Sequence, residues 1–256
     1  MKTTSKIGCG LAALVSMLTI GERSQAQSQG SDPIAICNST GLNVIIGTSN
    51  NDTITGTSGD DCIVGLGGQD TINALGGRDI VFGGDGDDVI NGGDETDSLA
   101  GGPGQDTING QEGADLLFGE GGDDRLSGGN SLDLISGGQG QDQVFGDADN
   151  DLVFGDDGDD QVFGGDGNDS VNGGPGNDRV FGEAGDDINI TGGPGDDTLN
   201  GGPGNDNLSD CVNHNTFDGG PGSNNCTFVP GSSNATNCTT TVVCNEGDGE
   251  GGRSSI

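Results

Sequence analysis

The amino-acid sequence predicts an all-β fold, a parallel β-roll (β-solenoid) of nonapeptide repeats with two parallel sheets. A nine-residue unit, of which Gly83 to Asn91 (GGDGDDVIN) is a regular copy, recurs eighteen times between Gly47 and Ser209. The sixth position of every unit is Asp, and the eighth is Ile, Val or Leu in every unit but one. A fixed period of this length indicates a solenoid and takes precedence over ordinary secondary-structure signals.

The composition of the unit explains this fold. Glycines at positions one, two and four permit positive φ and close backbone approach, so the first six residues can form a tight turn. Positions seven to nine then form a short strand, with position eight on one face and positions seven and nine on the other. Two units complete one flattened coil of eighteen residues, and stacked coils form two parallel sheets with aliphatics such as Ile72, Ile90 and Ile108 between them.

The first residues of the chain resemble a secretory signal peptide. Lys2 and Lys6 precede an apolar run from residue 7 to residue 20, and Ser24-Gln25-Ala26 has the small residues of a cleavage site. The apolar run is too short and too interrupted by glycine for a comfortable membrane span. We therefore expect no transmembrane segment and a secreted, extracellular or cell-surface-associated protein.

The chain divides into five segments according to its repeats and composition. These are the signal peptide (1–26), an N-terminal cap with a degenerate first repeat (27–46), the repeat array (47–209), degenerate repeats with a Cys-containing C-terminal cap (210–244), and an acidic tail expected to be flexible (245–256). In the degenerate repeats Asn43, Asn215 and Asn224 occupy position six. Terminal repeats of solenoids are atypical, and the neutral amide indicates where ion binding ends.

Six cysteines remain after the predicted leader, and they flank the array. They are Cys37, Cys62, Cys211, Cys226, Cys238 and Cys244. An even number in an exported chain indicates disulfides, whose connectivity the sequence does not determine. We expect disulfides that staple the ends of the solenoid, with Cys37–Cys62 as the first pair. A zinc site that includes Cys211 and His214 is the alternative, which oxidising export disfavours.

The charge of the chain points to cation binding. The formal net charge is −35 at pH 7, and stacking places each position-six Asp roughly 4.8 Å from its counterpart in the next coil. Carboxylates held so close repel one another unless a cation lies between them. Carboxylate oxygens and the carbonyl oxygens of glycine turns are the ligands that Ca²⁺ prefers. An acidic disordered chain is the alternative, but disorder would not keep Asp and an aliphatic in fixed phase.

The unit resembles the RTX (repeats-in-toxin, hemolysin-type) calcium-binding nonapeptide GGxGxDxUx, in which U is a large aliphatic residue. The resemblance covers about two thirds of the chain, from Gly47 to Ser209. It implies a parallel β-roll in which each Ca²⁺ is shared by turns on the same edge. Because the position-eight aliphatics form only a thin core for the array, we expect a chain that is disordered without calcium and folds on binding it.

We expect the metal ligands to come from the position-six carboxylates and from the glycine turns. The carboxylates are Asp52, Asp61, Asp70, Asp79, Asp88, Asp97, Asp106, Asp115, Asp124, Asp133, Asp142, Asp151, Asp160, Asp169, Asp178, Asp187, Asp197 and Asp206. The turn residues are Gly83, Asp85, Gly101, Gly119, Gly137, Gly155, Gly164 and Gly173.

The two edges of the roll differ in sequence. Units that begin at Gly47, Gly65 and every eighteen residues thereafter keep glycine at position four after the first turn. The intervening units carry Glu95, Ser131 and Asp149 at that position. We therefore expect one well-filled row of ions and one row with weaker sites.

The outward strand positions also differ between the two sheets. The intervening units place large apolar residues outward, including Ile80, Phe82, Leu116, Phe118, Leu134, Leu152, Phe154, Ile188 and Ile190. An apolar stripe on an exterior indicates that something covers it: the ends of the chain, self-association, or a surface glycan or protein partner. The other sheet shows Thr and Asn, then Phe145, Phe163 and Phe181, and ranks of Thr and Asn leave an ice-binding β-solenoid as a further alternative.

The sequence offers little for catalysis or nucleic-acid binding. It has one histidine, His214, and no Trp or Tyr, and its charge opposes nucleic acid. No converging set of catalytic groups is apparent, so we do not expect an enzyme. The function predicted is a secreted calcium-binding structural, adhesive or interaction module. An accessory or polysaccharide-binding module of a secreted enzyme system is the alternative.

Overall fold

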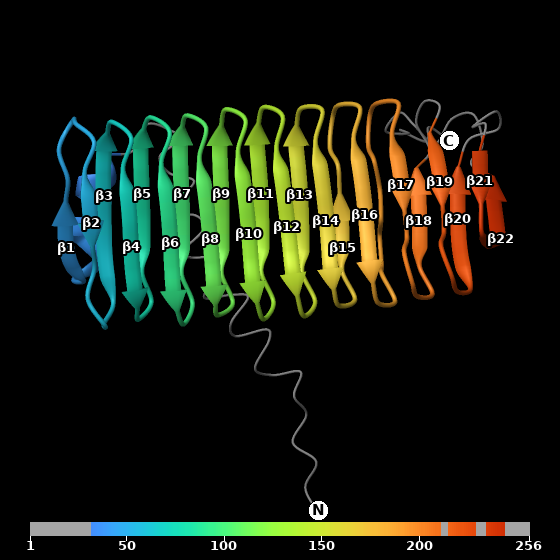
Figure 1. Cartoon of the computed structure of the whole chain (residues 1–256), viewed down its shortest axis with the longest axis horizontal. Helices are drawn as coiled ribbons and strands as arrows, with labels where there is room; N and C mark the ends of the chain where they lie inside the picture. The colour runs from blue at the N-terminus through green and yellow to red at the C-terminus, as the bar shows by residue number, and fades with distance from the viewer. Residues whose placement is uncertain (1–31, 211–214, 229–233, 244–256) are drawn as a thin grey trace, which may run out of the picture.

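The computed structural model describes residues 32–210, 215–228 and 234–243. In this part of the chain the strands succeed one another along one long axis and alternate between two layers (Figure 1). All strand pairs are parallel and join residues eighteen apart along most of the roll, for example Thr53 with Thr71 and Val153 with Val171. The predicted all-β parallel β-solenoid with an eighteen-residue coil is confirmed.

The two layers consist of three sheets. The eight-stranded sheet comprises β1 (Asn43–Ile46), β3 (Asp61–Gly67), β5 (Ile80–Asp85), β7 (Ser98–Pro103), β9 (Leu116–Gly121), β11 (Leu134–Gln139), β13 (Leu152–Asp157) and β15 (Ser170–Asn172). The eleven-stranded sheet comprises β2 (Thr53–Thr55), β4 (Thr71–Gly76), β6 (Val89–Asp94), β8 (Thr107–Glu112), β10 (Arg125–Asn130), β12 (Gln143–Ala148), β14 (Gln161–Asp166), β16 (Arg179–Ala184), β17 (Thr198–Asn200), β19 (Thr216–Asp218) and β21 (Asn234–Thr236). The three-stranded sheet comprises β18 (Asn207–Asp210), β20 (Asn224–Phe228) and β22 (Cys238–Val243).

The core lies between the layers and is formed by the position-eight side chains. From Ile63 to Val180 these aliphatics have no exposed surface, and Ile54 of the first unit is 7% exposed. Phe217 and Cys226 continue the column through the degenerate repeats. Alternation of side chains along each short strand, with period two, places these residues inward as the sequence predicts.

The one-residue insertion near the end of the array lies earlier than expected. We expected Asn189 at core position eight, Thr191 as the inserted residue and Ile190 outward. That assignment is wrong: Ile190 is fully buried in the core and bridges to Leu208, whereas Ile188 is 54% exposed. Asn189 takes φ 57°, a left-handed conformation that Asn tolerates well and that absorbs the extra residue.

The N-terminal end of the roll is capped by the helix α2 (Pro33–Thr40). Asp32 caps the helix by accepting a hydrogen bond from the Ile34 N–H, and Gly41 ends it with φ 79°. The disulfide Cys37–Cys62 ties this helix to β3, as predicted. No helix within the described residues is long and apolar enough to cross a membrane.

The C-terminal end is stapled as well. Cys226 and Cys238 form a disulfide between β20 and β22, and Asn replaces Asp at position six of the degenerate repeats, as expected. Cys211, His214 and Cys244, on which the remaining pairings and the zinc alternative depend, lie outside the described residues. The segment predicted to be a signal peptide and the acidic tail also lie outside them.

The outer face of the eight-stranded sheet is partly covered. Phe82 is fully buried and Phe118 is 6% exposed, in a second apolar cluster that also contains Cys37 of α2. Ile34 and Ile36 of α2 pack against this cluster. The N-terminal cap therefore covers part of the outward apolar stripe that the sequence predicts.

The outer face of the eleven-stranded sheet carries two side-chain ladders. Asn91 and Asn109 each donate an amide hydrogen bond to the Asn of the preceding coil, at 2.9 and 3.1 Å. Further along, Phe145, Phe163 and Phe181 stack with ring centroids 4.9 and 4.8 Å apart. The outward-facing Thr rank is interrupted by Val89, which is 39% exposed.

Candidate metal sites

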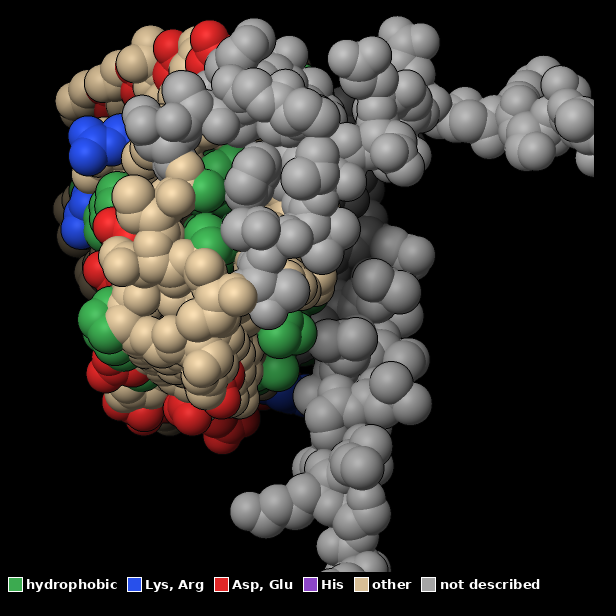
Figure 2. Space-filling model, turned by 90° about the vertical axis from the view of Figure 1, so that its right-hand side faces the viewer, with side chains coloured by type: hydrophobic (Ala, Val, Ile, Leu, Met, Phe, Trp, Pro, Cys, Tyr) green, Lys and Arg blue, Asp and Glu red, His purple; other side chains and the backbone are tan. Residues whose placement is uncertain are grey.

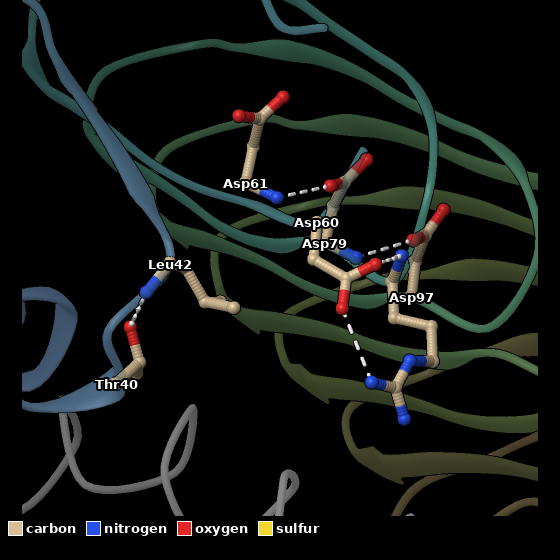
Figure 3. Close-up of polar contacts among 7 residues, drawn as sticks. Thr40, Leu42, Asp60, Asp61, Asp79 and Asp97 are labelled. Carbon is tan, nitrogen blue, oxygen red and sulfur yellow. Dashed lines mark hydrogen bonds and ion pairs between the residues drawn. The ribbon is translucent and has the colours of Figure 1, made fainter. Parts of the chain in front are cut away.

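From Asp61 onward, each position-six carboxylate accepts a hydrogen bond from the coil that precedes it. The Asp61 N–H donates to Asp79 Oδ1 at 2.7 Å, and the Asp79 N–H donates to Asp97 Oδ1 at 2.8 Å (Figure 3). The same bond repeats along both edges, and every position-six Asp after Asp52 is buried. The turns therefore hold carboxylates in two continuous buried rows. Other acidic side chains gather at the surface along the lower and upper edges of the view down the roll (Figure 2).

The second carboxylate oxygen of these residues is what makes the rows unusual. In sixteen of them Oδ2 is buried and has no hydrogen-bond partner among the described residues. They are Asp70, Asp79, Asp88, Asp97, Asp106, Asp115, Asp124, Asp133, Asp142, Asp151, Asp160, Asp169, Asp178, Asp187, Asp197 and Asp206. Buried polar atoms are almost always paired, so a row of unpaired oxygens indicates a group that the protein itself does not provide.

The first carboxylate of each edge differs from the rest. Asp52 Oδ2 accepts a hydrogen bond from the Thr48 N–H, and Asp61 Oδ2 accepts one from the Thr57 N–H, both at 2.6 Å. The sequence does not distinguish these two aspartates from the others, apart from Thr in place of Gly at position two of their units. Their second oxygen is thus already satisfied by the backbone.

Asn224 shows what surrounds the unpaired oxygens. It occupies position six of a degenerate repeat, and its Oδ1 accepts from the Asp206 N–H at 2.8 Å, as an Asp would. Its Nδ2 takes the place of the second carboxylate oxygen and donates to the carbonyls of Gly219, Gly220 and Asn237. The position-six side chain therefore faces backbone carbonyl oxygens. An amide satisfies them, but a charged carboxylate oxygen among carbonyls needs a proton or a cation.

The position-one glycines lie beside these oxygens. A Cβ built on Gly83 would lie 2.5 Å from Asp88 Oδ2 and 2.6 Å from the Gly101 carbonyl oxygen. At the other predicted turn glycines, a Cβ would lie 2.2 to 2.7 Å from the position-six Oδ2 of the same unit. These glycines are Gly101, Gly119, Gly137, Gly155, Gly164 and Gly173. Glycine thus leaves open a small space bounded by carboxylate and carbonyl oxygens. Asp85, in contrast, is exposed, and its carbonyl accepts from the Gly68 N–H.

Burial strongly affects the protonation of these carboxylates in the metal-free chain. Desolvation raises the pKa of Asp97 and Asp133 to about 9, although hydrogen bonds from the backbone of Asp79 and Asp115 lower it in part. The pKa of Asp88, near one end of its row, rises to about 6 for the same reason. A carboxylate at these positions is therefore stabilised either by a proton, which neutralises it, or by a bound cation.

The donor set fits a hard cation bound by few side chains. The described residues contain no group of three or more His, Cys, Asp or Glu side chains that could hold a metal ion. A site in a turn must therefore combine carboxylates with backbone carbonyls, and Ca²⁺ accepts both types of oxygen. By analogy with Asn224, the carbonyl at position two, such as that of Gly84, belongs to the ligand set. The ligands predicted from the sequence did not include this carbonyl, although the paired glycines at positions one and two of the repeat were a signal for it.

The two edges differ in backbone conformation at position four. Glu95, Ser131 and Asp149 adopt φ between 77° and 85°, whereas Gly86, Gly104 and Gly122 of the other edge have φ of 128°, 158° and 130°. The carboxylates that follow Glu95, Ser131 and Asp149 are buried as deeply as those of the other edge. The difference in the turn does not expose the carboxylates, so a weaker ion row on this edge stays a prediction.

A single methyl group provides a test of the glycine cradle. Gly119→Ala is expected to displace Asp124 Oδ2 and the Gly137 carbonyl, from which the new Cβ would be 2.4 and 2.3 Å away. We expect the variant to bind fewer calcium ions and to lose about 1–3 kcal/mol of stability in calcium. Gly121→Ala is the matched control, because a Cβ there meets nothing within 4 Å. Calorimetric titration with calcium checks both, and equal ion counts in the two variants would contradict the assignment.

Comparison with known proteins agrees with this geometry. The family model for the RTX calcium-binding nonapeptide repeat matches residues 39–72, 64–99, 91–126, 100–133, 118–153, 154–188 and 189–209. The comparison with curated proteins gives no match. The matched segments extend over most of the chain and contain both rows of carboxylates. RTX nonapeptide repeats bind calcium ions, and the chain belongs to the family of RTX calcium-binding nonapeptide repeat proteins.

Proposed function

We propose that this protein is an exported structural and interaction module whose roll folds on binding calcium in its turns. The unpaired Oδ2 atoms of the buried carboxylate rows carry the proposal. Without cations these rows place repelling charges in a buried environment around a core only one side chain wide. With Ca²⁺ each pair of successive turns is cross-linked through its carboxylates and carbonyls, so binding and folding become one process.

We assign the calcium ligands to the sixteen position-six carboxylates that have an unpaired oxygen, together with carbonyls at positions one and two. Asp52 and Asp61 begin the rows and differ because Thr48 and Thr57 already satisfy their second oxygen. Asp85 is exposed and is the weakest candidate of the predicted ligands.

Export is the second part of the proposal. The N-terminal segment has the charged start, apolar run and small residues of a signal peptide, and disulfides such as Cys37–Cys62 form in oxidising compartments. Calcium-dependent folding suits this route, because RTX repeats and disulfides are typical of extracellular proteins.

We further propose that the protein is not catalytic. β-Rolls of this family are generally structural. The acidic side chains of the described residues are arranged in regular rows, and those rows are explained by ion binding. The outer faces of the sheets then provide the surfaces for adhesion, self-association or docking to a glycan or protein.

Circular dichroism tests calcium-coupled folding. We expect the purified chain without its leader to show little strand signal in EGTA and a strong strand signal in millimolar calcium, with a sigmoidal transition between them. Magnesium at the same concentration is the control, since it requires a stricter geometry and gives up its water reluctantly. Equal strand content in EGTA and in calcium would rule out the proposal.

A further inference from the structure

A cavity of about 530 Å³ opens on the outer face of the eight-stranded sheet, where the strands meet one edge of turns. Phe118 and Ser136 line it from β9 and β11, and Glu120, Gly138 and Asp156 line it where three successive strands bend into their turns. Neither the metal sites nor the core accounts for this hollow. We propose that it binds an organic cation, an amidinium or guanidinium group attached to an apolar body.

The shape of the cavity follows from a break in two side-chain columns. The strand register places Ser136 between Phe118 and Phe154. On the opposite sheet, Phe residues on successive strands stack 4.8 to 4.9 Å apart with nearly parallel rings. Ser136 therefore occupies a position in the column where an aromatic ring would fit between Phe118 and Phe154. The space left is about as thick as one planar group.

A second column is interrupted at the same coil. Position two of three successive coils on this edge is Glu120, Gly138 and Asp156. Gly138 has no side chain, so the hollow above Ser136 continues between two carboxylates. The cavity is thus a slot with an apolar wall at Phe118 and an acidic rim.

The acidic rim contains a carboxylate oxygen without a hydrogen-bond donor in the described part of the chain. Glu120 Oε1 is buried and has no hydrogen-bond partner among the described residues. Asp156 Oδ2 accepts a hydrogen bond from Ser136 Oγ, which keeps this carboxylate over the slot. A ligand with several N–H donors and a positive charge would satisfy Glu120 and pair with Asp156.

An organic cation fits better than a metal ion. The described residues hold no group of three acidic, His or Cys side chains close enough for a metal, and the Phe118 ring offers a metal no ligand. The ring does favour a planar cation, because aromatic faces attract guanidinium groups. The same molecule contains that contact elsewhere: the Arg125 guanidinium carbon lies 4.3 Å from the centroid of the Phe145 ring.

Benzamidine, a planar amidinium on an apolar ring, is the probe. We expect it to bind the calcium-saturated protein with a millimolar or tighter dissociation constant, measured by calorimetry or NMR chemical-shift perturbation. Benzamide, which has the same shape without the charge, is expected to bind at least about tenfold more weakly. Absence of benzamidine binding, or equal binding of the two probes, would overturn the proposal.

Two variants test whether the ligand binds in the slot, and neither is expected to unfold the roll. Ser136→Phe fills the hollow with a ring, as in the stack on the opposite sheet, and is expected to abolish binding. Glu120→Gly removes the unpaired carboxylate and relieves a non-glycine residue at φ 76°, so stability should hold while affinity falls at least about tenfold.

The opposite sheet offers a matched control. Ser127 donates a hydrogen bond to Asp147 as Ser136 does to Asp156. Ser127→Phe should leave benzamidine binding unchanged, and unchanged strand signal in calcium confirms that all three variants fold. Binding that survives Ser136→Phe, or that Ser127→Phe weakens equally, would place the probe elsewhere and overturn the assignment.

Discussion

In calcium-free buffer the chain is expected to gain strand content as the pH is lowered from about 9 to about 4, the reverse of ordinary acid denaturation. Burial raises the pKa of Asp97 and Asp133 from 3.8 in the free side chain to about 9 in the roll. The folded state therefore binds more protons than the unfolded state between these values. The free energy of unfolding of the metal-free roll must then fall as the pH rises through this window.

The size of this effect makes it measurable. Each pKa unit corresponds to about 1.4 kcal/mol, so a carboxylate such as Asp133 costs the metal-free fold about 4 kcal/mol at pH 7. Flanking carboxylates such as Asp88, with a pKa of about 6, contribute less and over a narrower range. Several such groups act in the same direction, and protonation removes their cost below about pH 4.

Circular dichroism at fixed temperature across the pH series tests this expectation. Calcium should be removed by chelating resin, because soluble chelators lose affinity in acid. The control is a series of thermal melts in saturating calcium, where the melting temperature should fall on acidification because protons compete with Ca²⁺ for the carboxylates. Metal-free strand content that rises with pH would show that the rows are not buried as described.

Replacing Asp by Asn in the middle of one row is expected to make those turns independent of calcium. Asn224 shows the reason, because its Nδ2 donates to the surrounding carbonyls where Asp leaves an unpaired oxygen. The triple variant Asp97→Asn, Asp115→Asn and Asp133→Asn should bind fewer calcium ions. In calcium-free buffer at pH 8 it should show more strand signal by circular dichroism than the parent chain.

Two control sets separate the possible causes. Asp87, Asp123 and Asp159 occupy exposed position five on the other edge, so their change to Asn removes the same charge without affecting a buried site. Changing the three buried Asp to Ala removes the charge but supplies no donor to the carbonyls. If the explanation from Asn224 is right, the buried Asn set gains more calcium-free strand signal than either control set. An equal gain in the exposed set would attribute the effect to general charge repulsion.

The repeat predicted much of the fold because each unit contains the residues that determine its own conformation. A fixed Asp and a fixed aliphatic determine the turn, the strand and the inward face, and Ile72, Ile90 and Ile108 lie in the core as expected. The prediction failed where the period was interrupted. Ile188 and Ile190 are equally apolar, and contact with Leu208 in the next coil decides that Ile190 turns inward. That contact has no signature in the local sequence.

The sequence predicts which residues form the two rows but not how each carboxylate oxygen is used. The sequence supplies the row of Asp, yet only the structure shows that the backbone satisfies Oδ1 and leaves Oδ2 without a partner. It also shows that Asp52 and Asp61 differ from the rest, because the Thr48 and Thr57 amides lie within reach. The sequence predicted that the ends of the chain are one of the possible covers of the outer sheet, but not that the cover is the helix α2, since the cap lies outside the periodic pattern.

The insertion at Asn189 has a consequence for how such a protein changes over generations. One extra residue is taken up by a single left-handed backbone position, and the following strand pairs Arg179 with Thr198 in an unchanged parallel arrangement. A length error in one coil thus does not propagate to its neighbours. Coils can be gained, lost or altered one at a time, so the length of the rod and the pattern on its faces can evolve independently of the fold.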